Sequence, residues 1–370
     1  MHLRRRRQVT AVGVAAVATA LSLAACSSSS SSPAAGGGSS STPAGGSPAA
    51  GGAKLNGTLN GSGSTFQLTF QQAAISAFKS VQSGMTVNYG GGGSGKGRTD
   101  LASGTVQYAG SDSTIPDKEK ANFNGKTVLY FPVLIGPISV AYNLSGVSNL
   151  KLTPDVIAEI FQGKITNWDN SAIKSINSGV NIPSTPITIA VRADSSGTTQ
   201  NFSLFLEKAA PSTWKLGSSS TISWPSTARA GNGNGGVAQI VKTTPGAIGY
   251  VDYADAKATG LSSAQVKNKD GNYVAPSTQS ATAAASGVTV SPNLTFHAVW
   301  ASGAQAYPIT YQSWVLVYET QSSSNTAKLL QAYIGYLLGD GQQLLPQLGY
   351  APLPSSLDTS AKAQLSKIGM

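Results

Sequence analysis

The sequence has a single cysteine, Cys26, and only two histidines, His2 and His297. One cysteine excludes a disulfide within the chain and the zinc sites built from several cysteines. There is no H-E-x-x-H motif and no G-x-S-x-G motif, since the nearest stretch, Gly92–Lys96, has lysine where the second glycine belongs. We expect His297 to be a partly buried structural residue rather than a general base. We therefore expect no enzyme activity, no metal site and no cofactor.

Charged residues are also scarce, at 11% of the sequence. The formal net charge is +10, but Arg4–Arg7 lie in a segment that we expect to be removed, which leaves +6. The lysines are scattered singly rather than in runs, so the charge does not predict nucleic-acid binding. A mild positive potential is suited instead to a small anionic ligand.

The amino-terminal segment has no acidic residue and no apolar run of comfortable length for a membrane span. Arg4–Arg7 precede the mostly apolar run Val9–Ala25, which has the length of the apolar part of a signal peptide. The run ends in Leu-Ala-Ala-Cys at Cys26, which resembles a bacterial lipobox. The alternative is an ordinary signal peptide that is cut nearby and leaves a free thiol.

The lipobox resemblance implies that residues 1–25 are a lipoprotein signal peptide and that the sulfur of Cys26 carries a lipid such as palmitate. The mature protein would then be anchored to the cell membrane on its extracytoplasmic face. Residues 27–53 contain only serine, glycine, alanine, proline and one threonine, too little apolar surface to offset the entropy of ordering. We expect residues 26–53 to be a lipidated cysteine and a disordered tether that spans roughly 30 Å.

Residues 54–370 alternate short apolar runs with helical patterns, and this order predicts an α/β fold of two domains. We expect a first strand directly before Gly57–Gly63. The long apolar runs Val128–Asn143, which contains Pro132 and Pro137, and Tyr307–Glu319 are expected to be strands at which the chain crosses between domains. Domain I would comprise residues 54–136 plus 306–370, and domain II residues 137–305.

Three loops share one design, in which a strand leads through a turn rich in glycine, serine and threonine into a helix. They are Gly61–Phe66, Gly90–Gly97 and Arg192–Thr199. Helix N-termini leave N–H groups unpaired and carry partial positive charge, so each loop can bind an anion. The same residue types are ordinary helix caps, so a single such loop would be weak evidence.

Arginine is rare after Arg7, where only Arg98, Arg192 and Arg229 occur. Arg192 ends an expected strand and stands two residues before Asp194. Its guanidinium is placed for bidentate recognition of an oxyanion, with Asp194 orienting it. The alternative is a surface ion pair of little energetic value.

The second loop, in the stretch YGGGGSGKGR at residues 89–98, has the G-x-x-x-x-G-K spacing of a nucleotide-binding P-loop. A P-loop has serine or threonine directly after the lysine to hold magnesium, but Gly97 occupies this position. ATP is also scarce outside the membrane. We therefore expect no nucleotide site.

The sequence resembles the phosphate-binding protein of bacterial phosphate ABC importers over essentially all of residues 55–355. The stretches that carry this resemblance follow one another in the family's order and are Gly-Ser-Gly-Ser-Thr-Phe (61–66), Val-Asn-Tyr with the glycine loop (87–97), Gly-Ser-Asp (110–112), Gly-Lys-Ile-Thr-Asn-Trp-Asp (163–169), Arg-Ala-Asp-Ser-Ser-Gly-Thr (192–198), Pro-Gly-Ala-Ile-Gly-Tyr-Val (245–251) and Tyr-Pro-Ile-Thr (307–310). The resemblance implies a two-domain, periplasmic-binding-protein-like α/β fold with a ligand cleft between domains joined by a two-strand hinge. It implies a monomeric extracytoplasmic receptor that binds inorganic phosphate with high affinity and delivers it to an ABC-type permease.

The resemblance also implies the phosphate ligands. The donors would come from the three loops and are Thr65, the backbone N–H of Phe66, Ser94, Arg192, Ser196, Gly197 and Thr198. Asp194 would hold Arg192, and Asp112 would be the only acceptor. Phosphate near neutral pH still carries a proton that Asp112 can accept, whereas sulfate carries none and would be repelled.

Two residues depart from the family's pattern. Gln67 stands where proline usually follows the phenylalanine; because the contact of Phe66 uses backbone, only the stiffness of the loop is in doubt. Lys96 stands where many relatives have small residues, and it either adds attraction at the mouth of the cleft or faces water. The alternative functions are a receptor for another oxyanion such as sulfate, a secreted phosphatase, and a phosphate sensor or adhesin without a role in transport.

Overall fold

The computed structural model describes residues 54–370, and these residues belong to one compact unit. The predicted signal peptide (1–25), the lipidated Cys26 and the tether (26–53) lie outside the described residues. Within residues 54–370, every helix is too short or too polar to cross a bilayer.

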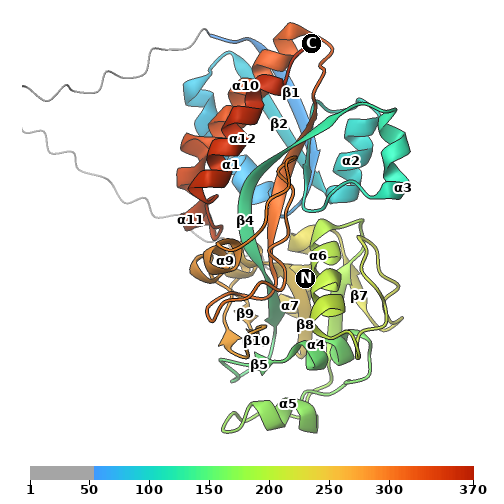
Figure 1. Cartoon of the computed structure of the whole chain (residues 1–370). Coiled ribbons are helices and arrows are strands. Elements are labelled where there is room, and N and C mark those ends of the chain that lie inside the picture. Colours follow the sequence, from blue (N-terminus) through green and yellow to red (C-terminus); the bar gives the residue numbers. More distant parts are fainter. Residues whose placement is uncertain (1–53) are drawn as a thin grey trace, which may run out of the picture. The chain divides into compact units, whose positions relative to one another are not determined.

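A mixed β-sheet runs through this unit (Figure 1). Its strand order is β2 (Met85–Gly92), β1 (Gly57–Gly63), β3 (Tyr108–Ser111), β12 (Thr310–Tyr318), β4 (Val128–Tyr142), β8 (Ala247–Asp252), β6 (Thr188–Arg192) and β7 (Arg229–Gly231), with β9 (Ser262–Ser263) also beside β4. A small second sheet contains β11 (Tyr273–Val274), β10 (Gln265–Lys267) and β5 (Lys151–Leu152).

Strand β4 divides the large sheet into two halves. Its residues 128–137 pair antiparallel with β12, whereas its residues 138–142 pair with β8. We call β2, β1, β3, β12 and residues 128–137 the first half-sheet, and residues 138–142, β8, β6, β7 and β9 the second half-sheet. Figure 1 shows β4 passing from one half to the other.

Helices cover both half-sheets. Those that accompany the first half-sheet are α1 (Leu68–Val81), α2 (Ser94–Ala102), α3 (Asp117–Lys120), α10 (Ser324–Leu338), α11 (Leu345–Leu348) and α12 (Ser355–Gln364), with 3-10 turns at Ala121–Phe123, Asp340–Leu344 and Leu365–Lys367. Those that accompany the second half-sheet are α4 (Pro154–Phe161), α5 (Ser171–Ile176), α6 (Gly197–Ala209), α7 (Gly233–Thr243), α8 (Tyr253–Thr259) and α9 (Thr278–Ala285). The predicted α/β character is confirmed.

The two prolines of β4 do not break the strand. Pro132 lies beside a bulge, because the register with β12 shifts between Ser313 and Trp314. Pro137 stands where the pairing changes from β12 to β8. Proline has no N–H to donate, and both positions are ones at which a regular ladder hydrogen bond is dispensable.

The prediction of a first strand before Gly57 is wrong, because β1 is the glycine-rich stretch Gly57–Gly63 itself. Glycine is needed here for close packing rather than for a turn. A Cβ on Gly61 would lie 2.2 Å from the ring of Tyr108 on the neighbouring strand β3. A Cβ on Gly63 would lie 2.2 Å from the carbonyl oxygen of Gly110, so β1, β3 and α2 approach each other more closely than larger residues allow.

Candidate anion-binding site

The three strand-to-helix loops converge at one place. The first loop leads from β1 into α1, the second from β2 into α2, and the third from β6 into α6. Hydrogen bonds join loops of opposite half-sheets: the N–H of Gly95 donates to the carbonyl oxygen of Ser195 at 3.0 Å, and the N–H of Asn234 donates to Oγ1 of Thr65 at 3.2 Å. The loops therefore form one cluster of polar groups.

Asp112 follows β3 directly and lies inside this cluster with 1% of its surface exposed. Its Oδ1 accepts hydrogen bonds from Ser64 Oγ at 2.5 Å and from Ser313 Oγ, and its Oδ2 accepts one from Ser94 Oγ at 3.2 Å. Burial raises the pKa of Asp112 by more than these hydroxyls and the charge of Arg192 lower it. Burying an isolated carboxylate is costly, and the hydrogen bonds from the three hydroxyls offset part of this cost.

Ser94 is the first residue of α2 and is fully buried. It follows Gly93, whose φ of 89° is accessible mainly to glycine. A Cβ on Gly93 would also lie 2.3 Å from Oδ2 of Asp194, so the second and third loops touch at this point. Lys96, the lysine of the P-loop-like spacing, has a side chain that is 55% exposed and pairs with Asp100 at 2.7 Å, as expected of a residue that faces water.

Arg192 ends β6 and is 5% exposed. Its Nε donates to Oδ1 of Asp194 at 2.9 Å and its Nη2 donates to Oδ2, so the guanidinium is held by both carboxylate oxygens. Its Nη1 donates to Thr198 Oγ1 at 3.3 Å and to Asn234 Oδ1 at 3.2 Å. Burial alone would raise the pKa of Asp194, but the hydrogen bond and charge of Arg192, with the N–H of Gly233, lower it.

The N-terminus of α6 abuts Asp112. Ser196 is the N-cap, and its Oγ accepts the N–H of Thr199 at 3.1 Å. A Cβ on Gly197 would lie 2.4 Å from Ser94 Oγ and 2.6 Å from Cβ of Asp112, so only glycine fits between them. The partial positive charge of this helix end therefore lies against the cluster.

All the residues expected to bind phosphate belong to this cluster. Besides Asp112, they are Thr65, Phe66, Ser94, Arg192, Ser196, Gly197 and Thr198, with Asp194 against Arg192. The N–H of Phe66 here donates to Ser64 Oγ at 3.1 Å. Its buried ring packs against that of Tyr311 at a tilt of 32°, with centroids 4.1 Å apart, which fixes the first loop. Cys26, the expected lipidation site, lies outside the described residues.

Asn234 is a fully buried residue of the cluster that the sequence analysis missed. Its amide bridges Arg192 and Asp252, since Oδ1 accepts from Arg192 and Nδ2 donates to Asp252 Oδ2 at 2.9 Å. It lies at the start of α7 in Gly-Asn-Gly-Asn-Gly-Gly (231–236), a fourth glycine-rich helix start. The design of the three loops is a signal that could have found it.

Ser64, Ser313, Asn201 and Arg98 also escaped the sequence analysis. Asn201 Nδ2 donates to the carbonyl oxygen of Asp112 at 2.6 Å. Arg98 is 1% exposed and donates to Ser113 Oγ at 2.9 Å, next to Asp112. Ser64 and Arg98 lie within two of the quoted stretches, whereas Ser313 and Asn201 lie in none of them. The contacts that all four make to Asp112 or its neighbours join segments that are separated in the chain.

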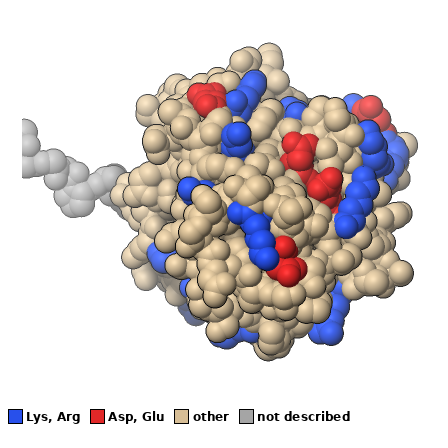
Figure 2. Space-filling model, turned by 90° about the horizontal axis from the view of Figure 1, so that it is seen from below, with Lys and Arg blue, Asp and Glu red and all other residues tan. Residues whose placement is uncertain are grey.

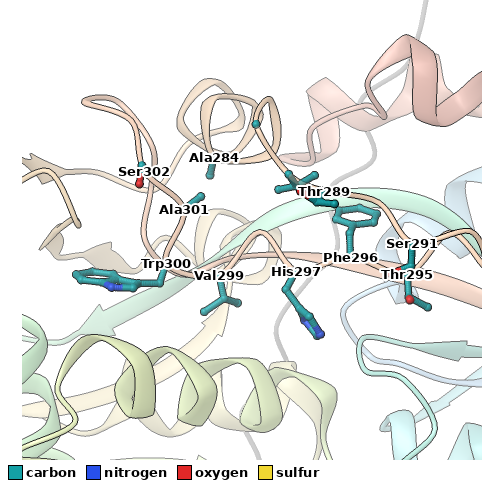
Figure 3. Close-up of a pocket in the computed structure, with 12 residues that line it drawn as sticks. Ala284, Thr289, Ser291, Thr295, Phe296, His297, Val299, Trp300, Ala301 and Ser302 are labelled. Atoms are coloured by element: carbon teal, nitrogen blue, oxygen red, sulfur yellow. The ribbon is translucent and has the colours of Figure 1, made fainter.

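A hollow that includes His297 lies apart from this cluster in residues 54–370. Figure 3 shows this hollow of about 610 Å³, which is lined by residues 284–302 and includes His297 and Trp300. The expectation that His297 is partly buried is wrong, because its side chain is exposed at this hollow. Partial desolvation and the charge of Lys208 lower its pKa. Within the described part of the chain, no group of three or more His, Cys, Asp or Glu side chains is arranged to hold a metal ion.

Surface charges are mixed on the face seen in Figure 2. Lysine and arginine side chains are dispersed there and lie next to acidic ones, so this face has no continuous basic patch. The concentration of donors around Asp112 is thus a property of the buried loops and not of this surface.

Residues 48–340 match the family model of the PBP superfamily domain. Phosphate-binding protein PstS 3 of Mycobacterium leprae is 32% identical over 337 residues, which are 87% of this chain and 90% of the relative. Phosphate-binding protein PstS of Pasteurella multocida is 31% identical over 313 residues, which are 83% of this chain and 89% of the relative.

Two solved structures share the fold. A high-affinity periplasmic phosphate-binding protein bound with phosphate, PfluDING, has a TM-score of 0.70 and 21% identity, over 83% of this chain and 93% of that one. A phosphate-binding protein from Stenotrophomonas maltophilia has a TM-score of 0.68 and 16% identity, over 83% of this chain and 94% of that one. At these identities the likeness shows the fold, and the expected two-domain, periplasmic-binding-protein-like fold is confirmed.

Proposed function

This chain belongs to the family of phosphate-binding proteins PstS within the PBP superfamily, and from this premise we propose that it binds inorganic phosphate and delivers it to the permease of an ABC-type importer. The observation that carries the proposal is the buried carboxylate of Asp112 within a cluster of N–H and O–H donors. Stripping water from an anion is costly, and fixed donors replace that hydration.

The proposed ligands are the groups that the loops bring together. The donors are Thr65, the N–H of Phe66, Ser94, Arg192, Ser196, Gly197 and Thr198. Asp112 is the proposed acceptor for the proton of the ligand, and Asp194 holds Arg192. Binding would redirect hydroxyls such as that of Ser94, which donates to Asp112 here, toward the oxygens of the ligand.

We also propose that domain I comprises residues 54–136 plus 306–370 and domain II residues 137–305. The change of β4 from pairing with β12 to pairing with β8 at residues 137 and 138 supports this division. Two neighbouring chain crossings would let the domains close over phosphate by a hinge. The proposal includes a monomeric mature protein, anchored on the extracytoplasmic face through a lipid on Cys26, that catalyses no reaction.

Titration calorimetry of the protein without its signal peptide tests the function. We expect heat on addition of phosphate and none on addition of sulfate at the same concentration. A folded protein that gives no heat with phosphate would contradict the proposal. Heat with sulfate alone would favour a sulfate receptor, and turnover of a chromogenic phosphate ester would favour a phosphatase.

A further inference from the structure

Gln67, the residue at which the chain departs from the family's usual proline, is fully buried beside the site. Its side-chain Nε2 lies 2.7 Å from Ser313 Oγ and 2.7 Å from the carbonyl oxygen of Trp314. Its Oε1 accepts a hydrogen bond from Gln71 Nε2 at 2.9 Å. Every polar atom of this amide therefore has a partner within the protein.

These partners fix which way the amide points. The carbonyl oxygen of Trp314 can only accept, so the amide nitrogen of Gln67 must face it. The second hydrogen of the same nitrogen then goes to Ser313. Gln71 is fixed in turn, because Oε1 of Gln67 can only accept and the nitrogen of Gln71 must therefore face it. This leaves Oε1 of Gln71 to accept the hydroxyl of Tyr333 at 2.6 Å.

The orientation of Gln67 decides where two hydroxyl protons go. Since Ser313 accepts from Gln67, its own proton is free to be donated to Oδ1 of Asp112. Ser64 is in the same position, because its Oγ accepts the backbone N–H of Gln67 at 3.3 Å and that of Phe66 at 3.1 Å and donates to the same Oδ1 at 2.5 Å. Gln67 thus contacts both hydroxyls that donate to one carboxylate oxygen, and it shares Ser64 with the N–H of Phe66.

The other oxygen of Asp112 faces the loops. Oδ2 accepts only the longer bond from Ser94, and it lies 2.7 Å from where a Cβ of Gly197 would be, at the N-terminus of α6. We propose that Gln67 is a specificity-determining positioning residue, which occupies Oδ1 of Asp112 with two hydroxyl protons and so leaves Oδ2 to accept the proton of the ligand. This inference rests on the proposed function.

Proline at position 67 could donate neither to Ser64 nor to Ser313, since it has no backbone N–H and no amide side chain. Hydrogen bonds to a carboxylate favour its ionised form, while burial opposes it. Loss of the Gln67 amide would free Ser313 to turn its hydroxyl away from Asp112. Asp112 would then take up a proton at a higher pH and would no longer repel sulfate.

Other ionisable groups also face Asp112. Arg192 on β6 favours its ionised form. Tyr89 on β2 and Tyr311 on β12 lie close, and burial raises the pKa of both hydroxyls, so they remain neutral while Asp112 titrates. Burial also raises the pKa of the Tyr350 hydroxyl, which therefore remains neutral over the same range. Two further carboxyls lie in the cluster. The pKa of Asp194 is lowered by Arg192, whereas burial raises that of Asp252 on β8, so the experiment separates the titration of Asp252 from that of Asp112.

The test compares Gln67→Leu with wild type by calorimetry of phosphate and sulfate across the pH range in which phosphate changes from one negative charge to two. In the variant we expect the preference for phosphate over sulfate to fall about tenfold, the effect of losing a hydrogen bond to a charged group. We also expect sulfate binding to begin at a higher pH than in wild type. Gln364→Leu is the matched control, since its buried amide donates to the carbonyl oxygen of Tyr130 and does not contact Asp112.

A double-mutant cycle with Asp112→Asn shows whether Gln67 acts through Asp112 and excludes Asp252 as the titrating group. In the Asp112→Asn background, Gln67→Leu is expected to change neither the preference nor the pH profile. An equal effect in both backgrounds, or an unchanged sulfate profile in Gln67→Leu alone, would overturn the proposal. If Gln67→Leu does not fold, Ser313→Ala removes the same donor and must shift the sulfate profile in the same direction. Absence of phosphate binding in wild type would contradict the proposed function instead.

Discussion

At Gly197 there is no room for one additional carbon atom. The N-terminus of α6 meets Ser94 and Asp112 so closely that a methyl group at this position would overlap with both. Elsewhere in a helix, alanine is the more favourable residue, so the preference for glycine here comes from tertiary packing.

We expect Gly197→Ala to weaken phosphate binding by about tenfold or more, because the clash forces the third loop away from the second. Gly235→Ala is the control, since Gly235 lies in α7 and a Cβ there meets nothing within 4 Å. Calorimetry with phosphate on both variants measures the difference. Equal affinities of the two variants would show that the close packing at Gly197 is irrelevant to binding.

Asp112→Asn is expected to reduce discrimination between phosphate and sulfate, because an amide can donate a hydrogen bond to an unprotonated oxyanion that a carboxylate repels. We expect the ratio of the two affinities to fall by about tenfold or more. Competition of sulfate against bound phosphate measures it. A ratio that stays at the wild-type value would exclude Asp112 as the residue that senses the proton of the ligand.

The same variant has a predicted effect on stability. The pKa of Asp112 is raised in the folded protein, so the folded state prefers the neutral acid. This contribution is fully present below the pKa of the unfolded chain and is lost as pH rises through the folded pKa. In the absence of phosphate, Asp112→Asn should therefore gain melting temperature relative to wild type as the pH rises from the ordinary value of 3.8 through the folded pKa. Thermal denaturation at several pH values checks this, and a constant difference would contradict it.

Arg98 connects helices α2 and α3 with the end of strand β3. It lies on α2, and its guanidinium pairs with Glu119 of α3, at 2.6 Å through Nε and 3.0 Å through Nη2. Its Nη1 donates to Ser111 and Ser113 on either side of Asp112. The side chain thus holds the helix that begins at Ser94 against the strand that ends beside Asp112.

Arg98→Met is expected to destabilise the protein by about 3 kcal/mol, because it leaves Glu119 and two serines without their partner. Urea denaturation monitored by fluorescence measures the loss. Adding Glu119→Gln should recover part of it, since the unpaired charge is then absent. No recovery in the double variant would place the cost in lost packing rather than in the broken ion pair.

Hydrogen bonds between loops of opposite half-sheets hold the two half-sheets in a closed arrangement around Asp112. The N–H of Gly95 donates to the carbonyl oxygen of Ser195, and the N–H of Asn234 donates to Oγ1 of Thr65. The two residues of each pair belong to different half-sheets. Since β4 is shared, movement at residues 137 and 138 would separate the loops without disrupting either half-sheet.

We expect phosphate to shift the protein toward this arrangement and to reduce its radius of gyration. Small-angle scattering with and without phosphate measures the change. Arg192→Ala, which removes a proposed ligand, should abolish the response. A radius that does not respond to saturating phosphate in wild type would argue against closure by a hinge.

Features that depend on neighbours along the chain can be predicted from the sequence. Thr153 and Ser196 cap α4 and α6, and such caps are local because they need only a hydroxyl and the next few N–H groups. The glycine-rich loops, Arg192 with Asp194, and the family motifs are local in the same sense. They were sufficient to predict the α/β fold and the expected ligands around Asp112, but not Asn234, Ser313 or Asn201.

The way in which Asp112 is held depends on contacts between segments that are far apart in the chain. Ser313 and Gln67 are separated by 246 positions, and Ser313 and Asp112 by 201. They meet because β12 pairs with β3 in the register that sets Trp314 opposite Ser111. The direction in which a hydroxyl donates depends on which acceptor and donor the sheet brings to it, and no pattern of residues along the chain encodes that geometry.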